Sequence, residues 1–119
     1  GHQEGDCALR VLANVLHLAS CRPLDLTCRW GGEEFLVLLP ETEAKGAMEV
    51  AQRILIETRA QSVKTASGDH LAFTVSIGIA TRKLIKPEDL TVLIAQADKA
   101  MLAAKSGGRD RVAVAISES

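Results

Sequence analysis

The sequence predicts an α+β fold in which helices cover the faces of a β-sheet. Two observations lead to this class. Two short apolar segments, residues 26–30 and 33–39, flank Gly31-Gly32, and a two-glycine loop between apolar strands is typical of an antiparallel hairpin because glycine adopts positive φ at little cost. Segments with helical apolar spacing lie on both sides of this hairpin, interleaved with further short strands.

The first element is predicted to be a helix over residues 6–19. Its apolar residues follow the three- and four-residue spacing of one helix face (Leu9, Leu12, Val15 and Leu16). Asp6 suits the start of this helix, as an N-cap or a first-turn acid. Pro23 then ends the pattern, since proline has no amide hydrogen and disfavours helical angles at the residue before it.

The remaining elements follow from helical spacing, from the alternation of Phe73, Val75 and Ile77 on one side of a strand, and from the residues that interrupt these patterns. Pro40 ends the hairpin, Gly68 marks a turn, Pro87 lies near a helix start, and Gly107 stops that helix. The predicted order is therefore α-ββ-α-β-β-α-β. After the hairpin, the elements are a helix over 43–59, short strands over 62–64 and 71–79, a helix over 90–105 and a strand over 112–116.

The composition and charge of the chain limit the kinds of partner that it can bind. The chain has 119 residues, enough for one domain, and 47% are apolar, so a core is available. The formal net charge of −1 offers no global attraction to nucleic acid or anionic lipid, which favours small partners. Three cysteines without C-x-x-C spacing argue against a disulfide framework and a zinc site and fit the reducing cytoplasm.

The ends and apolar runs of the chain suggest an excised, soluble segment. The longest unbroken apolar runs, residues 35–39 among them, have five residues, far below the roughly 18 residues typical of a membrane span, so we expect no membrane insertion by this segment. No signal peptide is recognisable. The chain begins at Gly1 rather than methionine, and we therefore expect it to be part of a longer parent protein.

The hairpin tip offers a possible metal and phosphate site. Glycine lets a phosphate approach backbone amides closely, and the carboxylates of Glu33 and Glu34 are hard oxygen ligands of the kind that Mg²⁺ prefers. Neighbouring residues of a strand point to opposite faces, so one of the two would dominate a given site. A plain Gly-Gly turn with solvated shoulders explains the spacing equally simply, and spacing alone favours that interpretation.

Two further clusters suit a purine nucleotide. A carboxylate such as Asp6 can accept hydrogen bonds from the N1 and N2 edge of guanine, although a helix cap is its simpler interpretation. Lys105 and Arg109 bracket a glycine turn and suit a di- or triphosphate. Lysine before glycine is also how ordinary helices end, so neither cluster is decisive by itself.

A third cluster, Arg22-Pro-Leu-Asp25, suits a guanine as well. Arginine can bond to O6 and N7 of guanine with two parallel donors, while an aspartate takes the opposite edge. A local surface ion pair, worth about 0–1 kcal/mol, is the simpler alternative. The three histidines share no metal-ligand spacing.

Taken together, these motifs carry a resemblance. In chain order they are GH-x-x-GD at 1–6, R-x-x-D at 22–25, R-x-GGEEF at 29–35, FTVSIGIA at 73–80 and ADKAMLAAKSGGRDRV at 97–112. Over nearly its whole length the chain resembles the GGDEF family of diguanylate cyclases. The resemblance implies a partial GGDEF domain over 1–119 and a fold similar to the palm of nucleotidyl cyclases and polymerases, a mostly antiparallel sheet flanked by helices.

The resemblance also implies roles for the hairpin residues. Glu33 would be the Mg²⁺ ligand nearest the attacking 3′-hydroxyl, and Glu34 a supporting acid. Gly31 and Gly32 would pass under the phosphates. The implied reaction joins two GTP molecules into cyclic di-GMP with release of two pyrophosphates, across a two-fold homodimer in which each protomer holds one GTP.

Binding roles follow from the same comparison of motifs. Asp6 would recognise the guanine edge with Leu9 lining the base, and Lys105 and Arg109 would hold the terminal phosphates. An inhibitory product site would be formed by three residues: Arg22, Asp25 and, on the following helix, Arg53.

The chain departs from the family pattern at its start. In the family, a strand and helix bearing an acidic metal ligand, an F-K pair and an asparagine precede the first motif, and none of these is present here. We therefore expect the sheet and the metal site to lack a wall, so that this segment binds cyclic di-GMP without making it. We expect a cytoplasmic location, with membrane attachment of the parent only through other domains.

Two other classes of function compete with this interpretation. The first is a non-catalytic GGDEF-like receptor for cyclic di-GMP or GTP, and the intact GGEEF sequence argues against it because affinity alone does not require a metal-binding glutamate. The second is a purely structural dimerisation domain, which leaves the co-occurrence of Asp6, Lys105 and Arg109 unexplained.

Overall fold

The computed structural model describes residues 2–20, 22–31, 34–64 and 67–115. The order of helices and strands along the chain is the order that the sequence predicts, except that one predicted strand is divided in two. In chain order the elements are α1 (His2–Ala19), β1 (Leu26–Gly31), β2 (Glu34–Leu38), α2 (Ala44–Arg59), β3 (Ser62–Lys64), β4 (His70–Ala72), β5 (Ser76–Ile79), α3 (Pro87–Ser106) and β6 (Arg111–Val114).

Within the described ranges, the strands form three separate two-stranded ladders. β1 and β2 make the predicted antiparallel hairpin, with Leu26 opposite Leu38 and Gly31 opposite Glu34. β3 and β4 form a second, short antiparallel ladder. β5 and β6 pair in parallel, as strands joined by a crossover helix do, and here α3 is that helix.

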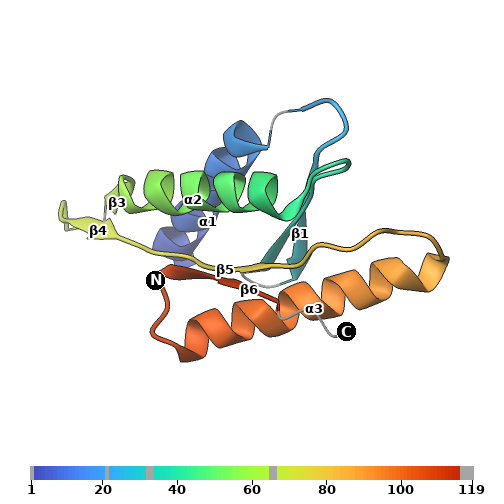
Figure 1. Cartoon of the computed structure of the whole chain (residues 1–119). Helices are drawn as coiled ribbons and strands as arrows, with labels where there is room; N and C mark the ends of the chain where they lie inside the picture. The colour runs from blue at the N-terminus through green and yellow to red at the C-terminus, as the bar shows by residue number, and fades with distance from the viewer. Residues whose placement is uncertain (1, 21, 32–33, 65–66, 116–119) are drawn as a thin grey trace.

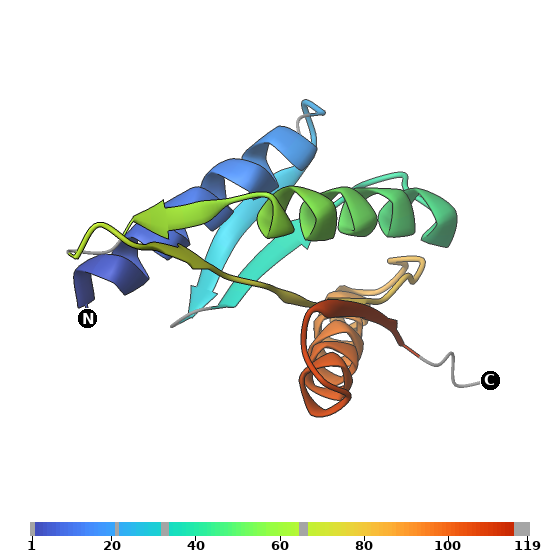
Figure 2. The ribbon, with the colours of Figure 1, turned by 90° about the vertical axis from the view of Figure 1, so that its left-hand side faces the viewer.

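The helices lie on two sides of the strands. Figures 1 and 2 show α1 and α2 crossing on one side of β5 and β6, while α3 covers the other side. On the α1–α2 side, a buried cluster of four residues forms the core (Val15, Leu16, Ala19 and Ile54), and partly buried side chains of β2 and β5 pack against it. No helix within the described ranges is long and apolar enough to cross a membrane.

The start of α3 is held by one carboxylate. Asp89, 9% exposed, accepts hydrogen bonds from the backbone N–H groups of Ile85 and Lys86 at 2.9 and 2.7 Å and from Arg82 Nε at 3.0 Å. Donation by Lys86 first, then by Ile85 and Arg82, lowers the pKa of the Asp89 carboxyl. Pro87 occupies the first turn, where its missing N–H leaves no unsatisfied donor.

Several element boundaries differ from the prediction. α1 begins at His2, so Asp6 lies inside the helix and the N-cap prediction is wrong. The expected strand 71–79 is split, because β4 pairs with β3 whereas β5 pairs with β6, and residues 73–75 belong to neither ladder. α3 begins at Pro87 rather than at Leu90, and the last strand covers 111–114 rather than 112–116.

Candidate functional site

The hairpin tip is the first part of the candidate site. Gly31 ends β1 directly opposite Glu34, the first residue of β2, and the pairing register shifts between Arg29 and Gly31. Glu34 is half-buried, so the ladder places a carboxylate at the end of the hairpin where two strand backbones meet. Gly32 and Glu33 lie outside the described residues.

The α3–β6 connector carries the two cationic candidates. Lys105, in the last turn of α3, is half-buried, and Arg109 is exposed. Arg109 and Asp110 both have positive φ, at 62° and 47°, a conformation that costs non-glycine residues energy and therefore needs support from the surrounding structure.

That support comes from two other arginines. Arg59, at the end of α2, donates from Nε to Asp110 Oδ1 at 2.8 Å and from Nη2 to the Asp110 carbonyl at 3.2 Å. Arg111 Nε donates to the Arg109 carbonyl at 2.9 Å. The Arg111 guanidinium also occupies the space beside Gly108, where an added Cβ would lie 2.3 Å from Nη2. The connector is thus tied to α2 by Arg59, and the φ of +125° at Gly108 favours glycine at that position.

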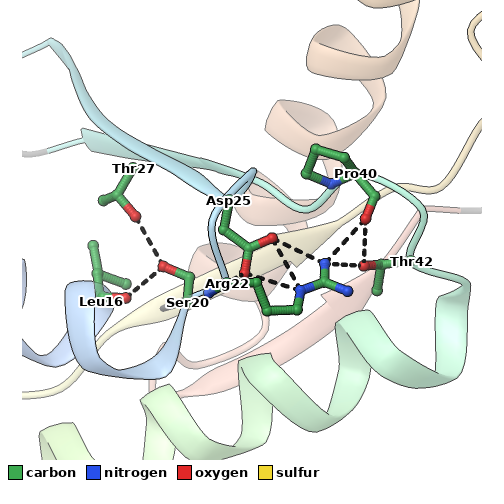
Figure 3. Close-up of polar contacts among 7 residues, drawn as sticks. All are labelled: Leu16, Ser20, Arg22, Asp25, Thr27, Pro40 and Thr42. Atoms are coloured by element: carbon green, nitrogen blue, oxygen red, sulfur yellow. Dashed lines mark hydrogen bonds and ion pairs between the residues drawn. The ribbon is translucent and has the colours of Figure 1, made fainter.

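Arg22 and Asp25 belong to a connected polar cluster near the hairpin (Figure 3). Arg22 Nε donates to both Asp25 oxygens at 3.2 and 3.1 Å, and Nη2 donates to Oδ1 at 2.9 Å. The Asp25 side chain is 3% exposed, whereas that of Arg22 is 52% exposed. The Arg22 hydrogen bonds hold the pKa of the Asp25 carboxyl below its usual value, and the same contact raises the pKa of Arg22.

Arg22 also connects two loops. Its Nη2 donates to the Pro40 carbonyl at 3.0 Å and to Thr42 Oγ1, both in the connector between β2 and α2. Thr42 Oγ1 in turn donates to the Pro40 carbonyl at 3.1 Å. Arg22 therefore holds the connector before β1 against the connector after β2. Sequence reasoning missed Pro40 and Thr42 because they lie 18 and 20 residues from Arg22.

The remaining candidates lie on helices. Leu9 is half-buried on α1, one turn after Asp6. Arg53 is exposed on α2 and lines a cavity of about 330 Å³ between α1 and α2, together with Asn14 and Glu57. It lies nine residues beyond Ala44, or about 14 Å along the helix axis. The structure thus joins Arg22 and Asp25 by hydrogen bonds, while Arg53 lies inside α2 and lines the cavity between α1 and α2.

Comparison with known proteins identifies the family. The family model described as "Diguanylate cyclase, GGDEF domain" matches residues 1–111. The chain belongs to the GGDEF domain family. The matched residues include the hairpin, the three connectors described above and the three helices that the structure describes, and the match confirms the resemblance carried by the motifs.

Curated GGDEF proteins give the same result. Diguanylate cyclase A of Treponema denticola is 37% identical over 113 residues, which are 94% of this chain and 29% of that protein. Diguanylate cyclase DgcM of Escherichia coli is 40% identical over 116 residues, 97% of this chain and 26% of that protein. The chain therefore spans roughly a quarter of the length of these relatives.

Solved GGDEF structures confirm the α+β, palm-like fold class. The GGDEF domain of DgcB from Caulobacter crescentus, in complex with c-di-GMP, superposes with a TM-score of 0.86 at 34% identity over 96% of this chain and 66% of that one. Diguanylate cyclase SiaD from Pseudomonas aeruginosa, in complex with its activator SiaC, superposes with a TM-score of 0.84 at 36% identity over 97% of this chain and 43% of that one.

Proposed function

We propose that this chain is the greater part of a diguanylate cyclase domain, which in its complete protein condenses two GTP into cyclic di-GMP and two pyrophosphates. The single observation that carries the proposal is the family match over residues 1–111 together with an uninterrupted GGEEF sequence at the hairpin tip. The same observation supports a cytoplasmic location, where GTP is available, and a single partial domain over 1–119.

The proposed chemistry is an in-line displacement across a two-fold axis. Each protomer of a homodimer holds one GTP, and the 3′-hydroxyl of each nucleotide attacks the α-phosphate of the other. Gly31 and Gly32 would lie beneath the phosphates, where the absence of side chains allows close approach. Lys105 and Arg109 would hold the terminal phosphates, and the ties from Arg59 and Arg111 keep their connector in place.

Guanine recognition is proposed for α1. Asp6 would accept hydrogen bonds from N1 and N2 of the base, with Leu9 lining its face. Leu9 follows Asp6 by one helical turn, so both lie on the same side of α1. A site built to hydrogen-bond the guanine edge discriminates strongly against adenine, which lacks those donors.

A divalent cation fits the donor type at the hairpin tip. Among the described residues, no three His, Cys, Asp or Glu side chains are placed so that they could hold a metal ion together. Mg²⁺ at nucleotides, however, is usually held by one or two carboxylates together with phosphate oxygens. Glu33 would be the carboxylate ligand, with Glu34 supporting it. Bound there, Mg²⁺ would neutralise charge on the transferring phosphoryl group.

The decisive test is Glu33→Gln in the complete parent protein. An amide has nearly the shape of the carboxylate but is a poor ligand for Mg²⁺, so cyclic di-GMP formation should fall to background while thermal unfolding stays unchanged. Glu49→Gln, at an exposed position of α2, is the matched control and should retain full activity. Product formation by Glu33→Gln near the parent rate would overturn the assignment.

For the 119-residue chain itself we propose binding of cyclic di-GMP without synthesis. The solved DgcB structure in complex with c-di-GMP supports product binding in this family. The product would bind at Arg22, Asp25 and Arg53 or at Asp6 and Leu9, and we favour the first location because an arginine matches O6 and N7 of guanine.

Calorimetry separates these two locations. Arg22→Ala should weaken cyclic di-GMP binding by about 10-fold or more, while Asp6→Ala and the control Arg10→Ala leave it unchanged. If instead Asp6→Ala weakened binding and Arg22→Ala left it unchanged, the product would be assigned to Asp6 and Leu9 on α1. Accumulation of cyclic di-GMP when the chain is incubated with GTP and Mg²⁺ would contradict the inactive assignment.

A further inference from the structure

The connector between α3 and β6 contains three consecutive residues with positive φ. These are Gly108 at 125°, Arg109 at 62° and Asp110 at 47°. Glycine adopts such angles at little cost, whereas Arg109 and Asp110 need contacts that hold them there. The direction in which the Arg109 side chain leaves the backbone therefore depends on what fixes the conformation at Asp110.

Arg59, in the last turn of α2, supplies that contact. Its Nε donates to Asp110 Oδ1 at 2.8 Å, and its Nη2 donates to the Asp110 carbonyl oxygen at 3.2 Å. Among the described residues, no other side chain forms a hydrogen bond or ion pair with Asp110. One guanidinium thus binds both the side chain and the backbone of Asp110, which restricts rotation of the chain at this residue.

The segments on either side of Asp110 are held independently. Arg111, the next residue, pairs with Ser76 in the parallel β5–β6 ladder. On the other side, the backbone N–H of Arg109 donates to the Ala104 carbonyl of α3 at 3.0 Å. If the backbone at Asp110 relaxed toward negative φ, the ladder and the helix would stay in place. The change would therefore be taken up by Arg109, which lies between them.

Charge alone makes Asp110 unfavourable for a phosphate site. The connector and the residue bound to it carry four cationic side chains: Arg59, Lys105, Arg109 and Arg111. Asp110 is the one carboxylate within residues 105–111. A carboxylate repels a nearby phosphate, so charge alone predicts that removing it would strengthen phosphate binding. A role in position predicts the opposite sign.

We propose that Asp110 and Arg59 are positioning residues for a polyphosphate: Arg59 binds Asp110, and Asp110 holds Arg109 in the direction that reaches the terminal phosphates of GTP. The Asp110 side chain is 38% exposed, so solvent and salt screen its repulsion. A displaced Arg109, by contrast, loses its charge-assisted hydrogen bonds to phosphate oxygens. This role rests on the proposed function, because it assumes that Arg109 contacts the terminal phosphates.

Two substitutions of Asp110 that change the charge equally test this role. Asp110→Asn keeps an oxygen that accepts from Arg59 and tolerates positive φ, whereas Asp110→Ala has neither property. In calorimetric titrations of the 119-residue chain with GTP and Mg²⁺, Asp110→Asn should bind GTP at least as tightly as the parent. Asp110→Ala should bind it about 3- to 10-fold more weakly, and so should Arg59→Ala.

Glu88→Ala is the matched control for charge. It removes a carboxylate from an exposed position in the first turn of α3, about 26 Å along the helix axis from Lys105. Its affinity for GTP should equal that of the parent. The double variant with Arg59→Ala and Asp110→Ala should bind GTP no more weakly than either single variant, because both changes remove the same contact.

GMP separates positioning from a general loss of structure. Its single phosphate lacks the terminal groups assigned to Lys105 and Arg109, so its affinity should stay within about 2-fold of the parent value in all these variants. A variant that is poorly folded would lose GMP and GTP alike. In that case Asp110→Gly takes the place of Asp110→Ala, because glycine adopts a φ of 47° without strain and also lacks the contact with Arg59.

Different results would overturn the positioning role and the proposed function. Parent affinity for GTP in Arg59→Ala would overturn the positioning role, and so would tighter binding by Asp110→Ala to the same extent as by Asp110→Asn. A parent chain that binds GTP no more tightly than GMP would instead contradict the phosphate contacts of the proposed function. The same conclusion would follow if Arg109→Ala left the affinity for GTP unchanged.

Discussion

Gly78 is the position where a single added methyl group should be most damaging. An alanine Cβ there would lie 2.2 Å from the Ala97 carbonyl oxygen and 2.2 Å from the Met101 amide nitrogen, both backbone atoms of α3. Real Cβ contacts essentially never fall below 3.0 Å. Because no side chain can rotate away, β5 and α3 must separate along their whole contact.

The expected cost follows from this geometry. Overpacking a filled interface costs about 1–3 kcal/mol, and two backbone contacts place Gly78→Ala at the upper end of this range. For a chain of this length, each kcal/mol lowers the thermal midpoint by about 3–5 °C, so a decrease of about 6–15 °C is expected. Thermal unfolding followed by circular dichroism measures it.

Gly46→Ala is the matched control. Gly46 lies inside α2, where alanine favours the helix by about 1 kcal/mol. The added Cβ would approach only the Thr42 Cγ2 methyl, at 2.9 Å, and a side-chain methyl can move. Its thermal midpoint should equal or exceed that of the parent. A midpoint of Gly78→Ala within about 3 °C of the parent, or equal losses in both variants, would refute the reasoning.

Two other substitutions probe the polar ties. Asp89→Asn should lower the thermal midpoint at neutral pH. The pKa of Asp89 is depressed in the folded chain, so its contribution is present above the usual carboxyl pKa of about 3.9 and is lost as pH falls through the folded value. The difference in thermal midpoint between the parent chain and Asp89→Asn should therefore become smaller below about pH 4. A difference that stays constant down to pH 2 would contradict this. Arg59→Ala breaks an exposed pair worth about 0–1 kcal/mol and should lower the midpoint by at most about 5 °C. Titration with GTP should nevertheless show that Arg59→Ala binds GTP several-fold more weakly than Arg10→Ala does, because Asp110 loses its hydrogen bond to Arg59 of α2.

Local sequence features predicted the hairpin and the helices well. Gly31-Gly32 between apolar segments specifies a hairpin without information from distant parts of the chain, and β1 and β2 end within one residue of the prediction. The second helix begins one residue later than expected, at Ala44. The alternation in residues 71–79 correctly indicated a strand facing the core, but alternation carries no information about partners. The split into β4 and β5 depends on pairing with β3 and β6, which lie elsewhere in the chain.

In the candidate site, too, the local contacts were predictable from the sequence and the long-range contacts were not. The Arg22–Asp25 pair is local and was expected, whereas the Pro40 carbonyl and Thr42 are brought to Arg22 by the hairpin. The tie between Arg59 and Asp110 spans 51 residues and had no recognisable sequence signal. The close contact at Gly78 did have a recognisable sequence signal, because a glycine inside an apolar strand often marks the close approach of another backbone.

The contacts of Arg22 limit how a product could bind there. Asp25 occupies the edge of the guanidinium formed by Nε and Nη2, and its own side chain is 3% exposed. Asp25 therefore holds Arg22 in place and cannot reach a guanine without releasing it. Within the part of the chain that the structure describes, Nη1 makes no hydrogen bond, and Nη2 is shared with the Pro40 carbonyl and Thr42.

A guanine that takes O6 and N7 contacts from Arg22 would need Nη1 and Nη2 together. Product binding would then replace the contacts of Nη2 with Pro40 and Thr42. These two residues follow β2 directly, and β2 begins at Glu34 of the hairpin tip. Occupancy at Arg22 would thus release one end of the strand whose other end carries the candidate catalytic carboxylates. In the proposed enzyme, this strand offers a direct physical route from bound product to the site of phosphoryl transfer.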